Sequence, residues 1–163
     1  MPSDEQITFA DHAARLYARR YGFPPMVGRV LGYLLVCEPR EQSIAELSEA
    51  LLASRSAVTG ALDVLERTTG SVRRSRAAGE RMDRVRVDVA GAEDQGFDVS
   101  EFRELGALAR EGLEVLADAP PERRADLLEM AALADFLADR IQALRQEWED
   151  HHAALRASGD LPS

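Results

Sequence analysis

Residues 43–68, SIAELSEALLASRSAVTGALDVLERT, decide the fold. Ser43 and, three residues later, Glu46 form a capping box, in which each side chain satisfies an amide left unpaired at the start of a helix. Ser54 is a second N-cap candidate. Apolar residues follow each cap at spacings of three and four, namely Ile44, Leu47 and Leu51, then Val58, Leu62 and Leu65. Two short helices therefore meet across about three residues, the spacing of a helix-turn-helix.

The next residues predict a β-hairpin. Arg84, Arg86 and Asp88 alternate with valines, as a half-buried strand requires, and residues 72–76 would be the partner strand. The sequence AAGE between the two strands supplies a glycine for a reversing turn. A helix-turn-helix at 43–68 and this hairpin, which we call the wing (residues 71–89), predict a winged helix.

Helical patterns flank this region on both sides. Residues 5–21 carry one apolar face that ends at Gly22, and residues 26–37 are apolar enough for a buried helix. After a loop expected at 90–97, one helix ends at Pro120 and a long final helix follows.

These patterns predict a mostly α protein with a small β-hairpin. We expect N-terminal helices over 1–37, the winged helix-turn-helix over 38–91, a C-terminal helical arm over 92–156 and a disordered tail over 157–163.

Charge is distributed unevenly along the 163 residues. The chain has a net charge of -9, but residues 54–91 hold eight arginines and five acids, whereas residues 92–163 hold seven arginines and seventeen acids. A basic surface on an acidic body steers a polyanion to one face. The first residues lack a signal-peptide pattern, and no apolar run is long enough to span a bilayer, so we expect a cytoplasmic protein.

The second helix of the helix-turn-helix is the candidate DNA reader. Small polar residues at its start allow close entry into the major groove. Arg55 can pair with the O6 and N7 atoms of guanine, while Ser54, Ser56 and Thr59 suit phosphates. Gly60 costs helix stability, which is understandable if something approaches the backbone there. The full set of candidate DNA contacts is Ser43, Ser54, Arg55, Ser56, Thr59, Gly60, Arg73, Arg74, Arg76, Arg81 and Arg84.

Two alternatives stay open at this point. The helices and hairpin would also suit an adaptor that binds protein partners without DNA, and a charged hairpin can serve only to protect a sheet edge. A continuous basic surface joining Arg55 to the wing would favour DNA. Cys37 is a candidate redox switch if exposed, and Glu147, Asp150, His151 and His152 are weak metal-ligand candidates, for which a structural cysteine and a solvated helix end are the simpler interpretations.

The order of motifs resembles the MarR-type winged-helix regulators, and more closely their GbsR-like branch. The resemblance rests on YGFPPMVGRVLGYLLVCEP, on QSIAELSEALLASRSAVTGALDVLERT, on the wing with its GER sequence and on two C-terminal helices in that order. It implies a homodimer joined by the terminal helices, a recognition helix that begins at Ser54 or Arg55, and repression or activation of a promoter. We expect repression.

The resemblance implies neither an enzyme nor a cofactor, and no catalytic motif is present in the sequence. A two-fold dimer would place two recognition helices about one DNA turn apart on a palindromic site.

The final helix carries a heptad seam that is a candidate dimer interface, with intrachain packing as the alternative. Its residues are Leu127, Met130, Leu137, Ile141, Leu144 and Trp148. A small-molecule effector is a further candidate partner, because some proteins of this type bind aromatic molecules or choline-like cations. Tyr17, Tyr21 and Tyr33 are the candidate lining residues, and core packing is the alternative for each.

Overall fold

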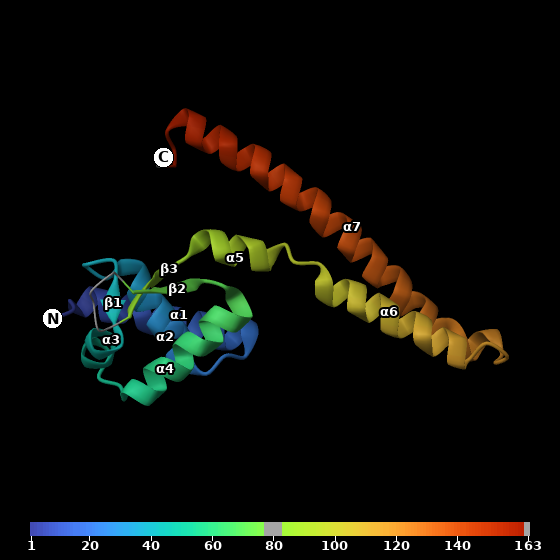
Figure 1. Ribbon diagram of the computed structural model, residues 1–163, viewed down its shortest axis with the longest axis horizontal. Coiled ribbons are helices and arrows are strands. Elements are labelled where there is room, and N and C mark those ends of the chain that lie inside the picture. The colour runs from blue at the N-terminus through green and yellow to red at the C-terminus, as the bar shows by residue number, and fades with distance from the viewer. Residues whose placement is uncertain (77–82, 162–163) are drawn as a thin grey trace. The chain divides into compact units, whose positions relative to one another are not determined.

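Helices and one small sheet make up the computed structural model, which describes residues 1–76 and 83–161 (Figure 1). The chain divides into two units, Met1–Gly96 and Phe97–Ser163. Unit 1 contains α1 (Asp4–Tyr21), α2 (Pro25–Val36), β1 (Gln42–Ser43), α3 (Ile44–Ala50), α4 (Arg55–Val64), the π-helical turn η1 (Leu65–Thr69), β2 (Val72–Ser75), β3 (Arg84–Val87) and α5 (Val89–Gly96). Unit 2 contains α6 (Ser100–Val115) and α7 (Pro121–Ser158). The predicted fold class is confirmed.

The core of unit 1 lies beneath the helix-turn-helix. Leu47 and Leu51 from the α3 segment meet Val58, Leu62 and Leu65 from α4 and η1, and all five side chains are fully buried. Burying one such side chain stabilises a fold by about 1.5–3 kcal/mol. The spacing of three and four in residues 43–68 therefore produces one continuous core.

Helices α1 and α2 pack unusually closely, because small residues face each other. A Cβ atom placed on Gly32 would lie 2.5 Å from the Cβ of Ala13 and 2.9 Å from the Cα of Ala10. A Cβ atom placed on Gly28 would likewise lie 2.8 Å from the carbonyl oxygen of Ala13 and 2.8 Å from the Cα of Ala14. The two backbones can approach only because these positions carry glycine.

The sheet has the order β1-β3-β2, and both pairings are antiparallel. The wing strands pair Val72 with Val87 and Ser75 with Arg84, which confirms the predicted hairpin, while its tip, residues 77–82, lies outside the described residues. Strand β1 pairs Gln42 with Val85 and was not predicted, since two residues give no periodicity. It attaches the base of the wing to the start of α3.

Unit 2 is a pair of helices packed through small residues. The buried positions are Gly106 and Ala109 on α6, with Ala131, Ala134 and Ala138 on α7. Most of the large apolar side chains on both helices remain exposed or half-buried.

Two predicted boundaries differ from the structure. The segment expected to be a loop forms α5, and the side chain of Asp88, just before this helix, accepts a hydrogen bond from the Gly91 amide at 3.3 Å. Helix α7 continues through Ser158, two residues into the segment predicted to be disordered, and ends at Gly159 in the left-handed conformation that favours glycine. No helix in the described part of the chain is both long and apolar enough to cross a bilayer.

Candidate nucleic-acid interface

Helix α4 turns one face to the core and presents the other to solvent. Val58, Ala61 and Leu62 are buried, whereas Arg55 and Gly60 are exposed. Two residues of the predicted recognition surface, Ser56 and Thr59, are exposed and half-buried respectively. The outward face predicted from the spacing is thus the face that the structure leaves open.

Arg55 is the first residue of α4 and has no acidic partner among the described residues. Its guanidinium is therefore available to an external acceptor without first breaking an ion pair. Ser54 caps the helix, since its Oγ accepts a hydrogen bond from the Ala57 amide at 3.2 Å and lies 3.0 Å from the Oγ of Ser56. These hydroxyls and the positive end of the helix dipole form a surface that suits a phosphate.

Gly60 leaves open space on the same face. A Cβ atom placed there would meet nothing within 4 Å. Packing inside the chain therefore does not require glycine, in contrast to Gly32 in α2. Glycine at position 60 would be required if a partner molecule came close to the backbone of α4.

The wing arginines behave differently, because each described one lies beside a carboxylate. Ion pairs join Arg73 to Asp88 at 2.8 Å, Arg76 to Asp83 at 2.6 Å, Arg84 to Glu46 at 2.9 Å and Arg86 to Glu41 at 3.9 Å. The positive charges of these wing arginines are therefore already neutralised by neighbouring acids, before any DNA is bound. A continuous basic surface from Arg55 to the wing was the feature that would favour DNA over a protein-binding adaptor, and these acids interrupt it.

Arg74 is the most enclosed of the wing arginines. Its side chain is 24% exposed, its Nη2 contacts the carboxylate of Asp63, and its Nε lies 3.0 Å from Oε2 of Glu66. Because Asp63 belongs to α4 and Glu66 to η1, Arg74 links β2 to the α4–η1 segment. Arg74 therefore stabilises the packing of the wing and is not available to an external partner.

Three other predicted contacts are placed by the structure as follows. Ser43 is buried, and its Oγ accepts a hydrogen bond from the Glu46 amide at 3.2 Å, so this hydroxyl caps α3 and lies beneath the surface. Arg84 is half-buried against Glu46. Arg81 lies outside the described residues.

Glu46 joins the cap to the wing. Its Oε2 accepts hydrogen bonds from the Ser43 amide at 2.6 Å and from Nη1 of Arg84 at 2.9 Å. The bonds from Ser43 and the charge of Arg84 hold the pKa of this carboxyl below its usual range. The cap is predictable from residues 43–46, but the bond to Arg84 is not, because Arg84 lies 38 residues away in the chain.

The three predicted effector tyrosines do not come together. Tyr17 and Tyr21 lie on the last turns of α1, where their rings are 5.5 Å apart, and Phe23 stacks on Tyr21 at 5.6 Å. Tyr33 instead lines a pocket with residues from the first turns of α1. Gly28 of α2 lies against Tyr17, and Tyr33 is five residues further along α2, which is about 8 Å at a rise of about 1.5 Å per residue. Neither Tyr17 nor Tyr21 lines the pocket.

The alternative chemical sites find little support. Cys37 is buried, and burial raises the pKa of its thiol, which disfavours the reactive thiolate. Among the described residues, no group of three histidine, cysteine or acidic side chains is placed to hold a metal. The ring of His152 stacks on Trp148 at 5.4 Å.

The predicted seam on α7 is divided between two surroundings. Leu127 faces α6, because a Cβ atom placed on Gly112 would lie 2.9 Å from its Cδ1. The half-buried positions are Met130, Leu137, Ile141 and Trp148, and Leu144 is 54% exposed. The exposed apolar residues that the seam did not include are Leu105, Leu108, Val115, Leu128, Leu133 and Phe136.

Comparison with known proteins places the chain beside transcriptional regulators. The family model of the MmpR5-like MarR family transcriptional regulators matches residues 98–151. Over 113 residues the chain is 37% identical to the HTH-type transcriptional regulator MmpR5 of Mycobacterium tuberculosis, covering 69% of this chain and 68% of that protein. A crystal structure of a transcriptional regulator is similar with a TM-score of 0.76 and 30% identity, covering 90% of this chain and 99% of that one.

Proposed function

Because the chain belongs to the MarR family of DNA-binding transcriptional regulators, which are not enzymes, we propose that it is a repressor that binds a palindromic promoter site as a homodimer. Each protomer would insert α4 into a major groove, and two-fold symmetry would set the two helices about one DNA turn apart. A small-molecule effector would gate this binding. The closer kinship to the GbsR-like branch stays a prediction.

The free guanidinium of Arg55 is the observation that carries the proposal. Arg55 is the first residue of α4, whose outer face is open to solvent. The hydroxyls of Ser54 and Ser56 lie next to it in the chain, and Gly60, which packing inside the chain does not require, follows on the same face. An arginine at this place can donate two hydrogen bonds to one guanine. The wing arginines, already paired with acids, would add phosphate contacts at the exposed positions Arg73 and Arg76.

The homodimer is supported by the surface of unit 2. Its two helices bury mainly alanines against each other and expose Leu133 at 53% and Phe136 at 60%. Large apolar groups on a helical hairpin are normally covered by another helical surface. In a two-fold dimer, the α6–α7 pair of the second protomer carries the same apolar face and would cover this one.

The test is a fluorescence-anisotropy titration against DNA from upstream of the chain's own coding region, with scrambled DNA as competitor. We expect saturable, competitor-resistant binding. Replacing Arg55 by alanine should weaken it by about 1–3 kcal/mol, because one bidentate base contact is lost.

Arg156→Ala is the matched control, since Arg156 is an exposed arginine at the end of α7, far along the chain from α4. Its affinity should equal that of the unmodified protein. Equal affinity for specific and scrambled DNA, followed by failure to select any site from genomic fragments, would overturn the proposal and favour the protein-binding adaptor.

A further inference from the structure

One charged residue interrupts the apolar sequence of α2. Arg29 is the only charged residue between Pro25 and Val36, and its side chain is 27% exposed. Its Nε donates a hydrogen bond to Oδ1 of Asp11 on α1 at 2.7 Å, and its Nη1 donates one to the carbonyl oxygen of Leu51 at 2.9 Å. Two nitrogens of one planar guanidinium thus join α1 and α2 to the end of α3.

The carbonyl that Arg29 binds belongs to the turn between the two helices of the helix-turn-helix. Helix α3 ends in a Schellman motif, in which the Ala53 amide donates to the Ser48 carbonyl at 3.0 Å and the Leu52 amide donates to the Glu49 carbonyl at 3.3 Å. Neither bond provides a donor for the carbonyl at the C-cap, which is among those that a helix leaves unsatisfied at its end. The guanidinium supplies that donor from a different helix.

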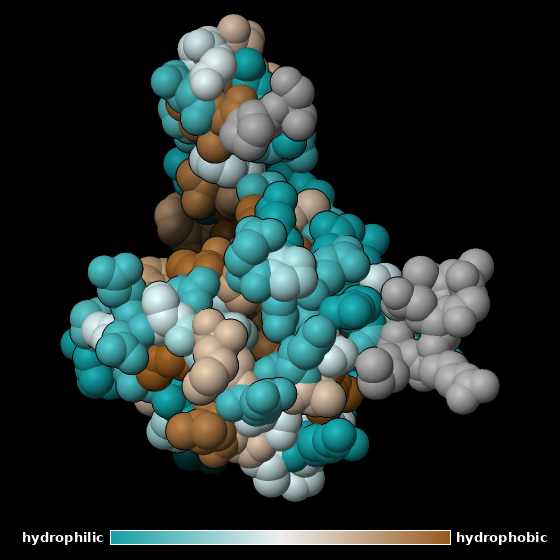
Figure 2. All heavy atoms as spheres, turned by 90° about the vertical axis from the view of Figure 1, so that its left-hand side faces the viewer, coloured by the Kyte–Doolittle hydropathy of each residue, from teal (hydrophilic) through white to brown (hydrophobic). Residues whose placement is uncertain are grey.

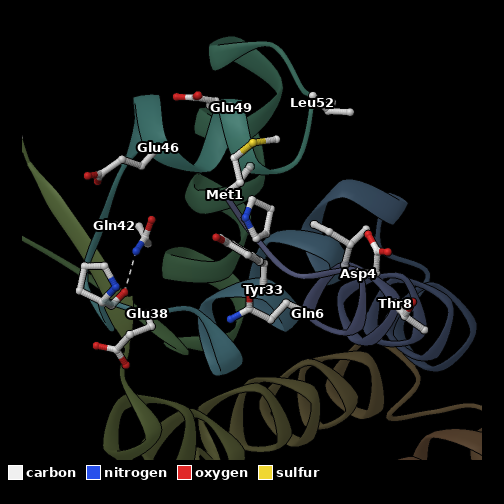
Figure 3. A pocket seen from close by; sticks show the side chains of 14 residues that line it. Met1, Asp4, Gln6, Thr8, Tyr33, Glu38, Gln42, Glu46, Glu49 and Leu52 are labelled. Atoms are coloured by element: carbon white, nitrogen blue, oxygen red, sulfur yellow. Dashed lines mark hydrogen bonds between the residues drawn. The ribbon is translucent and has the colours of Figure 1, made fainter.

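Packing contributes little to holding this turn. Leu52 is 94% exposed, and its φ of 51° is a left-handed conformation that favours glycine. The face of unit 1 that Figure 2 shows carries hydrophobic residues beside hydrophilic ones. Leu52 lies on the turn after α3, where it also lines the pocket of Tyr33 (Figure 3). Because an exposed leucine gains little from contacts inside the chain, the hydrogen bonds around the turn must hold this strained conformation.

The position of the turn determines where the recognition helix begins. Ser54, the N-cap of α4, stands two residues after Leu52, and the exposed Arg55 follows it. The hydroxyl of Ser48 holds the turn from the side of α3. Arg29 holds it from α2, whose apolar residues form much of the core of unit 1. The bond from Arg29 is therefore the one that fixes the start of α4 relative to the core.

Asp11 orients the guanidinium for this bond. An arginine side chain has several rotatable bonds, so holding it in one position costs conformational entropy. The bond from Nε to Asp11 fixes the plane of the group while Nη1 binds the Leu51 carbonyl. The carboxylate also balances a positive charge that is largely removed from water.

We infer that Arg29, oriented by Asp11, is a positioning residue for DNA recognition, an inference that rests on the proposed function. The guanidinium is engaged by Asp11 and Leu51, so it acts through Arg55 and not by touching DNA. Two hydrogen bonds to one guanine require a well-defined placement of the Arg55 side chain. Loss of the bond from Arg29 lets the start of α4 move, which weakens specific binding by removing this contact.

The first part of the test is hydrogen exchange followed by NMR, which does not depend on DNA. In the full chain, Arg29→Met should speed exchange at the Leu52 and Ala53 amides about tenfold more than at the Gly22 amide. The Gly22 amide donates to the Ala18 carbonyl at the end of α1, so its exchange measures any general loss of stability. Equal acceleration at all three amides, or none at the turn, would overturn the inference.

The second part is a double-mutant cycle measured by anisotropy titration on specific DNA. Arg29→Met should raise the Kd about tenfold when Arg55 is present, and less than about threefold in the Arg55→Ala background, where the positioned contact is already absent. A residue that only stabilises the fold would raise the Kd by the same factor in both backgrounds. Equal factors would therefore show that Arg29 does not act through Arg55.

Arg29→Lys replaces Arg29→Met in both parts if the methionine variant does not fold. Lysine keeps the charge but ends in one nitrogen where the guanidinium uses two, so the Kd should rise about threefold, again only when Arg55 is present. An unchanged Kd and unchanged exchange at the turn in this variant would show that the two-nitrogen bridge is not needed.

Arg40→Met is the matched control for the lost charge. Arg40 is an exposed arginine in the loop after α2, and it has no ion-pair partner in the part of the chain that the structure describes. This variant should match the unmodified protein in exchange at the turn and in Kd. If the unmodified protein binds no specific DNA, the proposed function fails, and the exchange measurement alone decides whether Arg29 holds the turn.

Discussion

Arg55 and Arg74 lie in the same basic stretch of the sequence, but they differ in exposure and in ion pairing. Arg55 is exposed and unpaired among the described residues, while Arg74 is held between Asp63 and Glu66. Removing Arg74 would leave two carboxylates without their cation at the junction of β2 and α4. At the scale of single residues, the partner of a charge decides its availability to DNA.

Gly60 allows stability and DNA affinity to be separated. We expect Gly60→Ala to stabilise the protein by up to about 1 kcal/mol, because the added methyl group meets nothing in the chain and alanine favours the helix. The same methyl group should weaken specific DNA binding about tenfold by holding α4 away from the groove. Urea denaturation and anisotropy titration measure the two effects. Unchanged DNA affinity in a stabilised variant would show that α4 does not approach DNA at this position.

The candidate site was predictable from the sequence only in part. Helical spacing placed Arg55 and Gly60 on the outer face of α4, and the structure has them there. The ion pairs were not predictable, because Arg84 meets Glu46 across 38 residues and Arg73 meets Asp88 across 15. Such partners depend on how strands and helices are brought together, which local periodicity does not encode.

At the scale of elements, the close approach of α1 and α2 depends on one small face. We expect Gly32→Ala to destabilise the protein by about 1–3 kcal/mol, because the new methyl group would lie 2.5 Å from the Cβ of Ala13 and force the helices apart. This cost exceeds the gain in helix propensity, so the change has the opposite sign to Gly60→Ala. Chemical denaturation monitored by circular dichroism measures it.

Gly96→Ala is the matched control for this prediction. Gly96 ends α5, and a Cβ atom placed there meets nothing within 4 Å. Its free energy of unfolding should stay within about 0.5 kcal/mol of the unmodified protein. An equal effect of the two substitutions would show that helix propensity, and not the contact with α1, governs both.

Elements with strong periodicity were predictable, and those defined by distant contacts were not. Segment 90–97 has no apolar repeat, yet it forms α5, where a Cβ atom on Gly91 would lie 2.4 Å from the carbonyl oxygen of Gly70. Strand β1 exists because Gln42 and Ser43 find β3, not because of their own preference. Tertiary contacts stabilise both elements, so the sequence near them carries little signal.

At the scale of the whole molecule, the apolar face of unit 2 tests the proposed dimer. We expect the double variant Leu133→Asp, Phe136→Asp to be monomeric, because two charges would be buried without partners in the interface. Sedimentation velocity should show the mass halved relative to the unmodified protein. Helix α7 should persist by circular dichroism, since both side chains are more than half exposed in the single chain.

Gln142→Asp is the control for the added charge, because Gln142 is an exposed polar residue on the same helix. This variant should remain a dimer. A double variant that also remains a dimer would place the interface elsewhere, and a protein that is already monomeric would refute the homodimer itself.

The paired wing arginines have a consequence for how the protein searches a chromosome. An arginine that leaves a carboxylate for a phosphate exchanges one ion pair for another, so little electrostatic energy is gained on arbitrary DNA. If the wing contacts DNA as proposed, we therefore expect the acids that neutralise it to shorten the time spent on wrong sequences. We then expect base contacts from α4 to govern retention at a site, with less sliding on arbitrary DNA.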